Sequence, residues 1–145
     1  SLSNKDGTGL NRIPHDNPHH TYSIGQHCLA TYKQLASTSP ELQEAALLHD
    51  IGKPFTKSFV NSKGETTEIA HYYEHHHVSA YDSLFYSNPA LNRLYIANVI
   101  QWHMRPFELE RDPRSKRATD KFRRLVGDNT FSDVMLLHRA DLLAH

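Results

Sequence analysis

Histidine and aspartate residues occupy helix positions where the surrounding hydrophobic pattern predicts a buried side chain, and this feature constrains the fold most. Histidine accounts for 12 of the 145 residues, although it is not among the common residues of globular chains. The groups that continue or close an apolar helical stripe are His27, His49-Asp50, His103 and Asp141. Burying an unpaired carboxylate costs several kcal/mol, so the fold must bring these groups to compensating partners.

Length and composition predict one globular domain without a membrane segment. Lys and Arg number 16, as do Asp and Glu, so net charge gives no reason for non-specific binding to nucleic acid or anionic membranes. The only cysteine, Cys28, excludes an internal disulfide and fits a reducing compartment. No apolar run could span a bilayer, and no segment resembles a signal peptide. We expect a cytoplasmic protein with no membrane partner, with an irregular arm over residues 1–16 and one domain over residues 17–145.

The periodicity of apolar residues predicts a mainly α fold with one small β-hairpin near residues 55–73. We expect helices over about 22–35, 41–50, 75–86, 89–103 and 121–126, and a last helix from 132 that the end of the sequence could cut short. The hairpin strands are expected over 55–60 and 66–73. Residues 107–118 are charged and include Asp112-Pro113, which predicts a loop.

A metal ion is one way to satisfy several buried histidines and carboxylates at once. A single histidine on an apolar face is more often a hydrogen-bonded core residue than a ligand. Such groups on several separate helices are harder to obtain by chance. Neutral imidazole and carboxylate suit Mn, Fe, Co, Ni, Zn or Mg, so the pattern predicts one or two divalent ions of open identity.

The segment Leu47–Pro54, with its His49-Asp50 pair, resembles the signature of the HD superfamily of metal-dependent phosphohydrolases. The stretches that resemble its other conserved segments are 17–27, 73–80, 99–103 and 136–141. The stretch after the predicted hairpin is most similar to the subgroup found in bacterial tRNA nucleotidyltransferases. The resemblance covers residues 17–145 and implies the helical HD fold.

The resemblance also implies a set of metal ligands. It assigns His27, His49, Asp50 and Asp141 to a first metal. In binuclear members the aspartate of the pair bridges two ions, and His75 and His103 would complete the second site.

The first turn of the third helix departs from the family pattern. Glu74 stands where the family usually has glycine, and it is followed by three histidines. Neighbouring helical residues point about 100° apart, so His75 and His76 cannot both face one site. The Val-Ser-Ala sequence that follows favours His75, with His76 as the alternative.

Two further residues are candidates for catalysis beside Asp50. Lys53 lies one turn beyond the His-Asp pair and could offset phosphate charge, or it could simply compensate the helix dipole. His20 could orient water or contact phosphate, or it could be a surface residue. The remaining histidines considered are predicted to be structural or on the surface: His15, His19, His71, His138 and His145.

The cations of the C-terminal third have two interpretations. Arg105, Lys121, Arg123 and Arg124 could line a phosphate entrance, although such a run is more often a solvated helix face. Trp102 is expected in the core rather than as a base-stacking platform.

We therefore expect an enzyme that uses metal-activated water to hydrolyse a nucleotide or another small-molecule phosphate ester. The alternative is a metal- or nucleotide-binding sensor, or an accessory module for a nucleic-acid-processing partner, that shows no turnover; the resemblance makes an RNA-related context one option. A third interpretation, a purely structural polar core, would require these groups to pair without metal.

Overall fold

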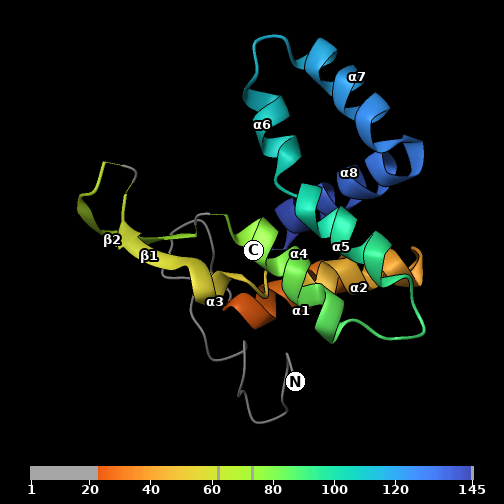
Figure 1. Ribbon diagram of the computed structural model, residues 1–145, viewed down its shortest axis with the longest axis horizontal. Coiled ribbons are helices and arrows are strands. Elements are labelled where there is room, and N and C mark those ends of the chain that lie inside the picture. Colours follow the sequence, from red (N-terminus) through yellow and green to blue (C-terminus); the bar gives the residue numbers. More distant parts are fainter. Residues whose placement is uncertain (1–22, 62, 73, 145) are drawn as a thin grey trace.

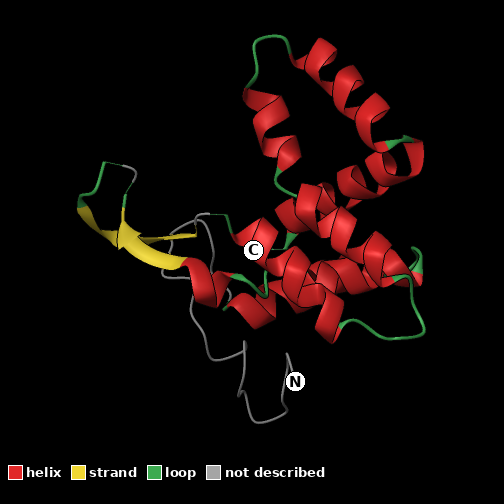
Figure 2. Ribbon diagram, in the orientation of Figure 1, coloured by secondary structure: helices red, strands yellow, loops and turns green. Residues whose placement is uncertain are grey.

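The computed structural model describes residues 23–61, 63–72 and 74–144. In chain order the elements are α1 (Ile24–Gln34), α2 (Pro40–Leu48), α3 (Lys53–Thr56), β1 (Lys57–Val60), β2 (Thr66–Tyr72), α4 (His75–Tyr86), α5 (Arg93–Trp102), α6 (Arg105–Arg111), α7 (Ser115–Val126) and α8 (Asp128–Leu143). This order confirms a mainly α fold with one hairpin, as Figure 2 shows. The predicted arm and His20 lie outside the described residues.

Helices α1, α2, α4, α5 and α8 pack into a bundle around one apolar core (Figure 1). The bundle's fully buried large side chains are Ile24, Leu42, Leu48, Ile96, Val99, Ile100, Val134 and Leu137. Local sequence signals set where two of the helices begin. The Ser23 hydroxyl accepts from the Gln26 backbone N–H in a capping box, and Ser39 caps α2 ahead of Pro40.

The hairpin projects from one side of the bundle (Figure 1). Strand β1 pairs antiparallel with β2, and a register irregularity lies between Ser58 and Val60. The prediction that the first strand begins at residue 55 is wrong, because Lys53–Thr56 forms the short helix α3. Pro54 lies in the first turn of α3, where its missing N–H has no cost, so it starts a helical turn after Gly52.

The region after α5 is more helical than the sequence pattern predicts. Residues 107–118 were expected to form a loop, but α6 occupies Arg105–Arg111 and α7 begins at Ser115. Pro106 lies in the first turn of α6, so it begins a helix instead of only ending the previous one. Each helix buries a very narrow apolar stripe, with Leu109 in α6 and Phe122 in α7, which charged neighbours obscure in the sequence.

The last helix also begins earlier than expected, at Asp128 instead of residue 132. It follows Gly127, whose φ of 88° is left-handed and turns the chain sharply from α7 into α8. Its buried face carries Val134, Leu137 and His138. In the described part of the chain, no helix combines the length and the apolar character needed to cross a bilayer.

Candidate metal centre

The bundle brings six of the predicted ionisable residues together, each at a defined place in an element. His27 lies within α1 and Asp141 within α8. His49 and His103 cap the C-terminal ends of α2 and α5, and Asp50 follows in the turn after α2. His75 is the first residue of α4. The centre therefore depends on the packing of five helices.

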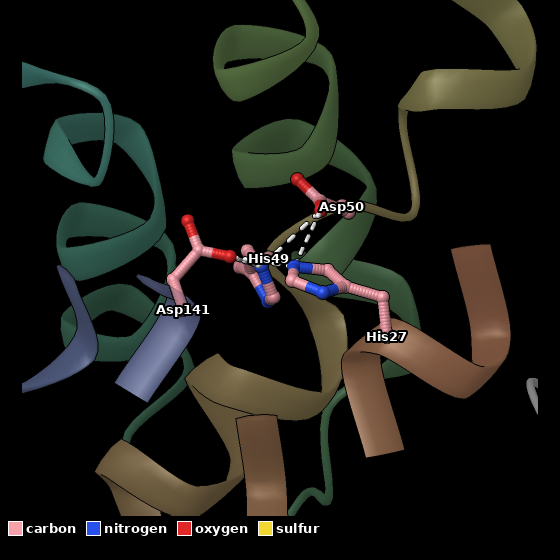
Figure 3. Close-up of side chains that lie close together, drawn as sticks. All are labelled: His27, His49, Asp50 and Asp141. Atoms are coloured by element: carbon pink, nitrogen blue, oxygen red, sulfur yellow. Dashed lines mark hydrogen bonds and ion pairs between the residues drawn. The ribbon is translucent and has the colours of Figure 1, made fainter. Parts of the chain in front are cut away.

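A first group contains His27, His49, Asp50 and Asp141, whose side chains converge in Figure 3. The Nε2 atom of His27 lies 2.5 Å from Asp141 Oδ1 and 3.6 Å from Asp50 Oδ2. The Nε2 atom of His49 lies 3.2 Å from Asp50 Oδ2 and 3.3 Å from Asp141 Oδ1. Both histidines therefore present the same ring nitrogen to the same pair of carboxylate oxygens.

A second group forms around the other oxygen of the same aspartate. Asp50 Oδ1 lies 3.0 Å from His75 Nε2 and 3.6 Å from His103 Nε2. The two imidazole Nε2 atoms are 3.2 Å apart. Asp50 thus directs one oxygen to each group, which is the arrangement of a carboxylate that joins two sites.

The four imidazoles are held from behind by backbone carbonyls. His49 Nδ1 donates to Ala46 O and His103 Nδ1 donates to Ile100 O, each at 2.5 Å. His75 Nδ1 donates to Tyr72 O at 3.1 Å, and His27 Nδ1 donates to Ala144 O. Because a carbonyl oxygen can only accept, each Nδ1 carries a hydrogen, and the neutral ring then has a bare lone pair on Nε2. This is the backing that orients metal-ligating histidines.

At the centre, the Nε2 atoms of the four imidazoles face the carboxylates of Asp50 and Asp141. The Nε2 atoms of His75 and His103 face each other and Asp50 Oδ1, so three acceptor atoms meet there unless a proton or a cation lies between them. These groups are almost fully buried, so water screens their repulsion poorly. Only added positive charge, as protons or a cation, makes such an arrangement favourable. This donor set of imidazole nitrogens and carboxylate oxygens fits a divalent metal.

The pKa shifts of Asp50 and Asp141 also show that nearby positive charge and hydrogen bonds stabilise the ionised carboxylates. Burial alone would raise the pKa of Asp50, but the charges of His49 and Lys53 outweigh burial and hold it well below its usual range. Burial also opposes ionisation of Asp141, yet hydrogen bonds from His27 and His49 lower its pKa. Both carboxylates are therefore ionised at neutral pH.

The pKa values of His49 and His103 shift in opposite directions. Burial alone would lower the pKa of His49, but Asp50 and Asp141 raise it well above its usual value. For His103, burial dominates and lowers the pKa to about 4, so the ring is neutral with a free Nε2 lone pair. Burial also raises the pKa of nearby Cys28 to about 11, which keeps the thiol protonated and makes it a poor ligand.

Lys53 lies at the edge of the centre and is almost fully buried. Its Nζ is 3.3 Å from Asp50 Oδ2 and 5.1 Å from the centre of the Tyr72 ring. Its ammonium therefore neutralises part of the carboxylate charge instead of facing solvent at a helix terminus. This contact favours a role at the site over the dipole interpretation.

Gly52 allows α4 to approach the His-Asp turn closely. A Cβ at this position would lie 2.6 Å from the Ser79 backbone nitrogen and 2.9 Å from His75 O. The Gly52 N–H donates to Ser79 Oγ at 2.8 Å. The absence of a side chain is therefore what lets His75 reach Asp50, a role that the sequence pattern did not reveal.

The structure brings His75, and not His76, to Asp50. His76 instead lies 3.9 Å from Glu74 Oε2, and His77 lies 3.1 Å from the same oxygen, in a more exposed group outside the centre. Glu74 has a left-handed φ of 60°. Glycine adopts this conformation without strain, which explains why the family pattern has glycine at this position. His138, predicted to be structural, is buried and pairs with Glu110 at 2.8 Å, away from the six residues.

Comparison with known proteins agrees with this geometry. The HD domain family profile matches residues 24–144, which include all six clustered residues. Searches of curated proteins and of solved structures returned no match. HD domains are generally metal-dependent hydrolases, and the buried His/Asp cluster is suited to divalent metal. Over residues 24–144, this chain belongs to the HD domain family.

Proposed function

We propose that this protein is a metal-dependent phosphohydrolase that acts on a nucleotide or another phosphate ester. The observation that carries the proposal is the division of Asp50 between two groups of buried imidazole nitrogens. Here the Nδ1 hydrogens point to the backbone, and the Nε2 atoms face inward.

The proposed ligands follow from the two groups. His27, His49, Asp50 and Asp141 would hold one divalent ion, and Asp50, His75 and His103 would hold a second. When bound, such ions polarise a phosphoryl oxygen and lower the pKa of water so that it can act as the nucleophile. The second group has fewer protein ligands, which leaves more coordination positions for substrate or water.

The chain's own residues would contribute orientation and charge. Lys53, held beside Asp50, would place its ammonium near the phosphate of a bound ester and stabilise charge that develops on it. The four backbone carbonyls keep each imidazole in the tautomer that binds metal. His20, which the resemblance places beside the site, is proposed to orient water or contact phosphate.

The finer assignments rest on the sequence resemblance. Kinship with the tRNA nucleotidyltransferase subgroup and an RNA-related context come from the similarity of residues 73–80, and a nucleotide substrate comes from the resemblance as a whole. The proposed cytoplasmic location rests instead on the single cysteine, which fits a reducing compartment. Both phosphomonoesters and phosphodiesters present the charged oxygens that the centre could accept. Assays with both a phosphomonoester and a phosphodiester should therefore decide the substrate class.

The test is hydrolysis by protein purified without nickel resin and supplied with Mn, Fe, Co, Ni, Zn or Mg in turn. We expect turnover of p-nitrophenyl phosphate, its bis ester or a nucleotide. Asp50→Asn should reduce the rate by about 100-fold or more, because it weakens both metal sites. Asp120→Asn, which removes an exposed carboxylate of α7, is the matched control and should leave the rate unchanged.

Two results would overturn the hydrolase proposal. One is an inert metal-loaded protein across the whole panel. If such a protein were still stabilised against melting by a nucleotide, the sensor or accessory-module interpretation would replace the enzyme. The other is equal loss of activity in Asp50→Asn and Asp120→Asn.

A further inference from the structure

We infer that the groove between α6 and α7 binds a single-stranded nucleic-acid segment. Half of the chain's 16 Lys and Arg residues lie between residues 105 and 126. The balanced net charge conceals this concentration. The inference concerns a surface outside the metal centre and does not depend on hydrolysis.

Four cations form one stripe that begins at the residue before α7 and continues along that helix. Arg114, Arg117, Lys121 and Arg124 follow one another at intervals of three or four residues, which places them on one side of the helix. At a rise of about 1.5 Å per residue, the stripe extends roughly 15 Å. All four side chains are exposed. A linear array of this kind matches an extended polyanion better than a single compact anion.

These cations differ from their neighbours in how they are paired. Arg123, which does not line the groove, pairs with Asp128 at 2.8 Å, and Arg105, at the groove's end, pairs with Glu108 at 2.5 Å. No ion pair with a carboxylate is found for the four stripe residues within the part of the chain that the structure describes. Unpaired, exposed cations keep most of their attraction for an added anion, because no carboxylate has to be displaced.

The stripe faces a hollow between the two helices, which lie next to each other at one end of the molecule (Figure 1). The hollow has a volume of about 530 Å³ and is lined by Arg105, Asp112, Ala118 and the four stripe cations. Its one carboxylate, on Asp112, accepts a hydrogen bond at 2.8 Å from the Arg114 backbone N–H. That oxygen is therefore held by the backbone, and the single negative charge offsets only part of the five cations that line the hollow.

A second hollow adjoins the first and is more apolar. It has a volume of about 470 Å³, is lined by Trp102, Phe122 and Leu125, and shares Arg105, Lys121 and Arg124 with the cationic hollow. The Trp102 ring packs against Phe122 at 5.4 Å but keeps part of its surface exposed. Aromatic surface beside a cationic groove is how proteins hold unpaired bases next to their phosphates.

Other anionic ligands fit this surface less well. A duplex keeps its base faces stacked, so it could use the cations but not the aromatic hollow. A small phosphate would require converging buried donors, and the stripe cations are exposed and dispersed. An anionic membrane is broad and flat, whereas this surface is concave. A single strand uses both hollows together.

The experiment measures binding of a fluorescein-labelled oligouridylate of about 12 nucleotides to the full chain by anisotropy. The variant Arg117→Glu/Arg124→Glu reverses two stripe charges, and Lys33→Glu/Lys63→Glu makes the same charge change at exposed sites elsewhere. We expect the stripe variant to bind at least tenfold more weakly and the control to bind nearly as wild type. For a single strand, the plot of log binding constant against log salt concentration has a slope of about −0.7 per phosphate contact. The slope should therefore change from about −3 in the wild type to between about −1 and zero in the stripe variant.

Trp102 supplies an independent readout because it is the only tryptophan in the chain. Unlabelled oligouridylate should quench its fluorescence in the wild type and the control, and should not do so in the stripe variant. Circular dichroism of each variant verifies folding. A gel of the recovered oligonucleotide separates binding from cleavage, so failure of the hydrolase proposal would not affect this result.

Three outcomes would overturn the inference. The first is equal weakening in the stripe variant and the control, which would mean that only net charge matters. The second is equal binding of a duplex of the same length, or binding without a change in tryptophan fluorescence. The third is binding to phosphatidylserine vesicles when the oligonucleotide does not bind.

Discussion

The helical bundle and the α6–α7 pair both contain clustered ionisable residues, but in opposite environments. In the bundle, six ionisable side chains are withdrawn from water and turned toward one another. On α7, four cations are exposed and have no carboxylate partner among the described residues. Burial forces charged groups to converge on a shared partner. Exposed charged groups are solvated by water instead, so they remain available to a ligand from solution.

The largest effects should come from breaking the convergence at its shared residue. Because Asp50 directs an oxygen to each group, Asp50→Asn should weaken binding at both sites, while His27→Ala and His103→Ala should each weaken one. Loss of a metal ligand or its support costs about 10- to 100-fold in affinity or more. Isothermal titration with Mn²⁺ or Zn²⁺ measures these losses. Equal effects of all three substitutions would contradict a shared aspartate.

The close approach of α4 to the His-Asp turn gives the next largest effect. Gly52→Ala places a methyl group 2.6 Å from the Ser79 backbone nitrogen, and we expect destabilisation of about 2–3 kcal/mol. Gly64→Ala is the control. Its Cβ has open space, so only the left-handed φ of 81° should cost about 1 kcal/mol. Urea denaturation measures both, and equal losses would show that Gly52 is not a packing constraint.

The strained residue between hairpin and α4 should respond in the opposite direction. Glu74→Gly relieves a left-handed φ of 60°, so stability should rise by about 0.5–1 kcal/mol. Urea denaturation without added metal avoids any contribution from ion binding. Glu65→Gly, at an exposed residue without a left-handed φ, should not be stabilising. Destabilisation by Glu74→Gly would mean that its contacts with His76 and His77 outweigh the strain.

The smallest effect concerns a link between α5 and α8 outside the metal centre. The Tyr95 hydroxyl donates to Asp133 Oδ2, and burial together with this bond raises the pKa of Tyr95. Because the folded pKa exceeds the unfolded value of about 10, the contribution is complete below pH 10 and falls as pH rises above it. Tyr95→Phe should therefore cost about 0.5 kcal/mol near pH 8 and less above pH 10, measured by urea denaturation. A constant difference would contradict the linkage.

The difference between the two regions also explains what the sequence could predict. His27, His103 and Asp141 interrupt clear apolar stripes, so their convergence, with both histidines buried, follows from periodicity together with the family resemblance. Helix α6 buries Pro106 and Leu109 among charged neighbours, a pattern too sparse to distinguish a helix from a loop.

Contacts between segments that are distant in the sequence could not be predicted either. Nothing near Gly52 in sequence indicates that Ser79 will pack against it, and nothing near His27 indicates the carbonyl of Ala144. The choice between His75 and His76 likewise required the direction of the first turn of α4. These details decide which histidine can serve as a ligand, and they exist only once the bundle is assembled.

Metal content is the most direct test of the claim that the buried cluster is a metal centre. Protein purified without nickel resin, and then dialysed with each divalent ion, should retain one or two ions per chain by elemental analysis. Asp50→Asn should retain fewer, and the folded Asp120→Asn control should match wild type. A folded wild-type protein that retains no ion under any of these conditions would contradict the account.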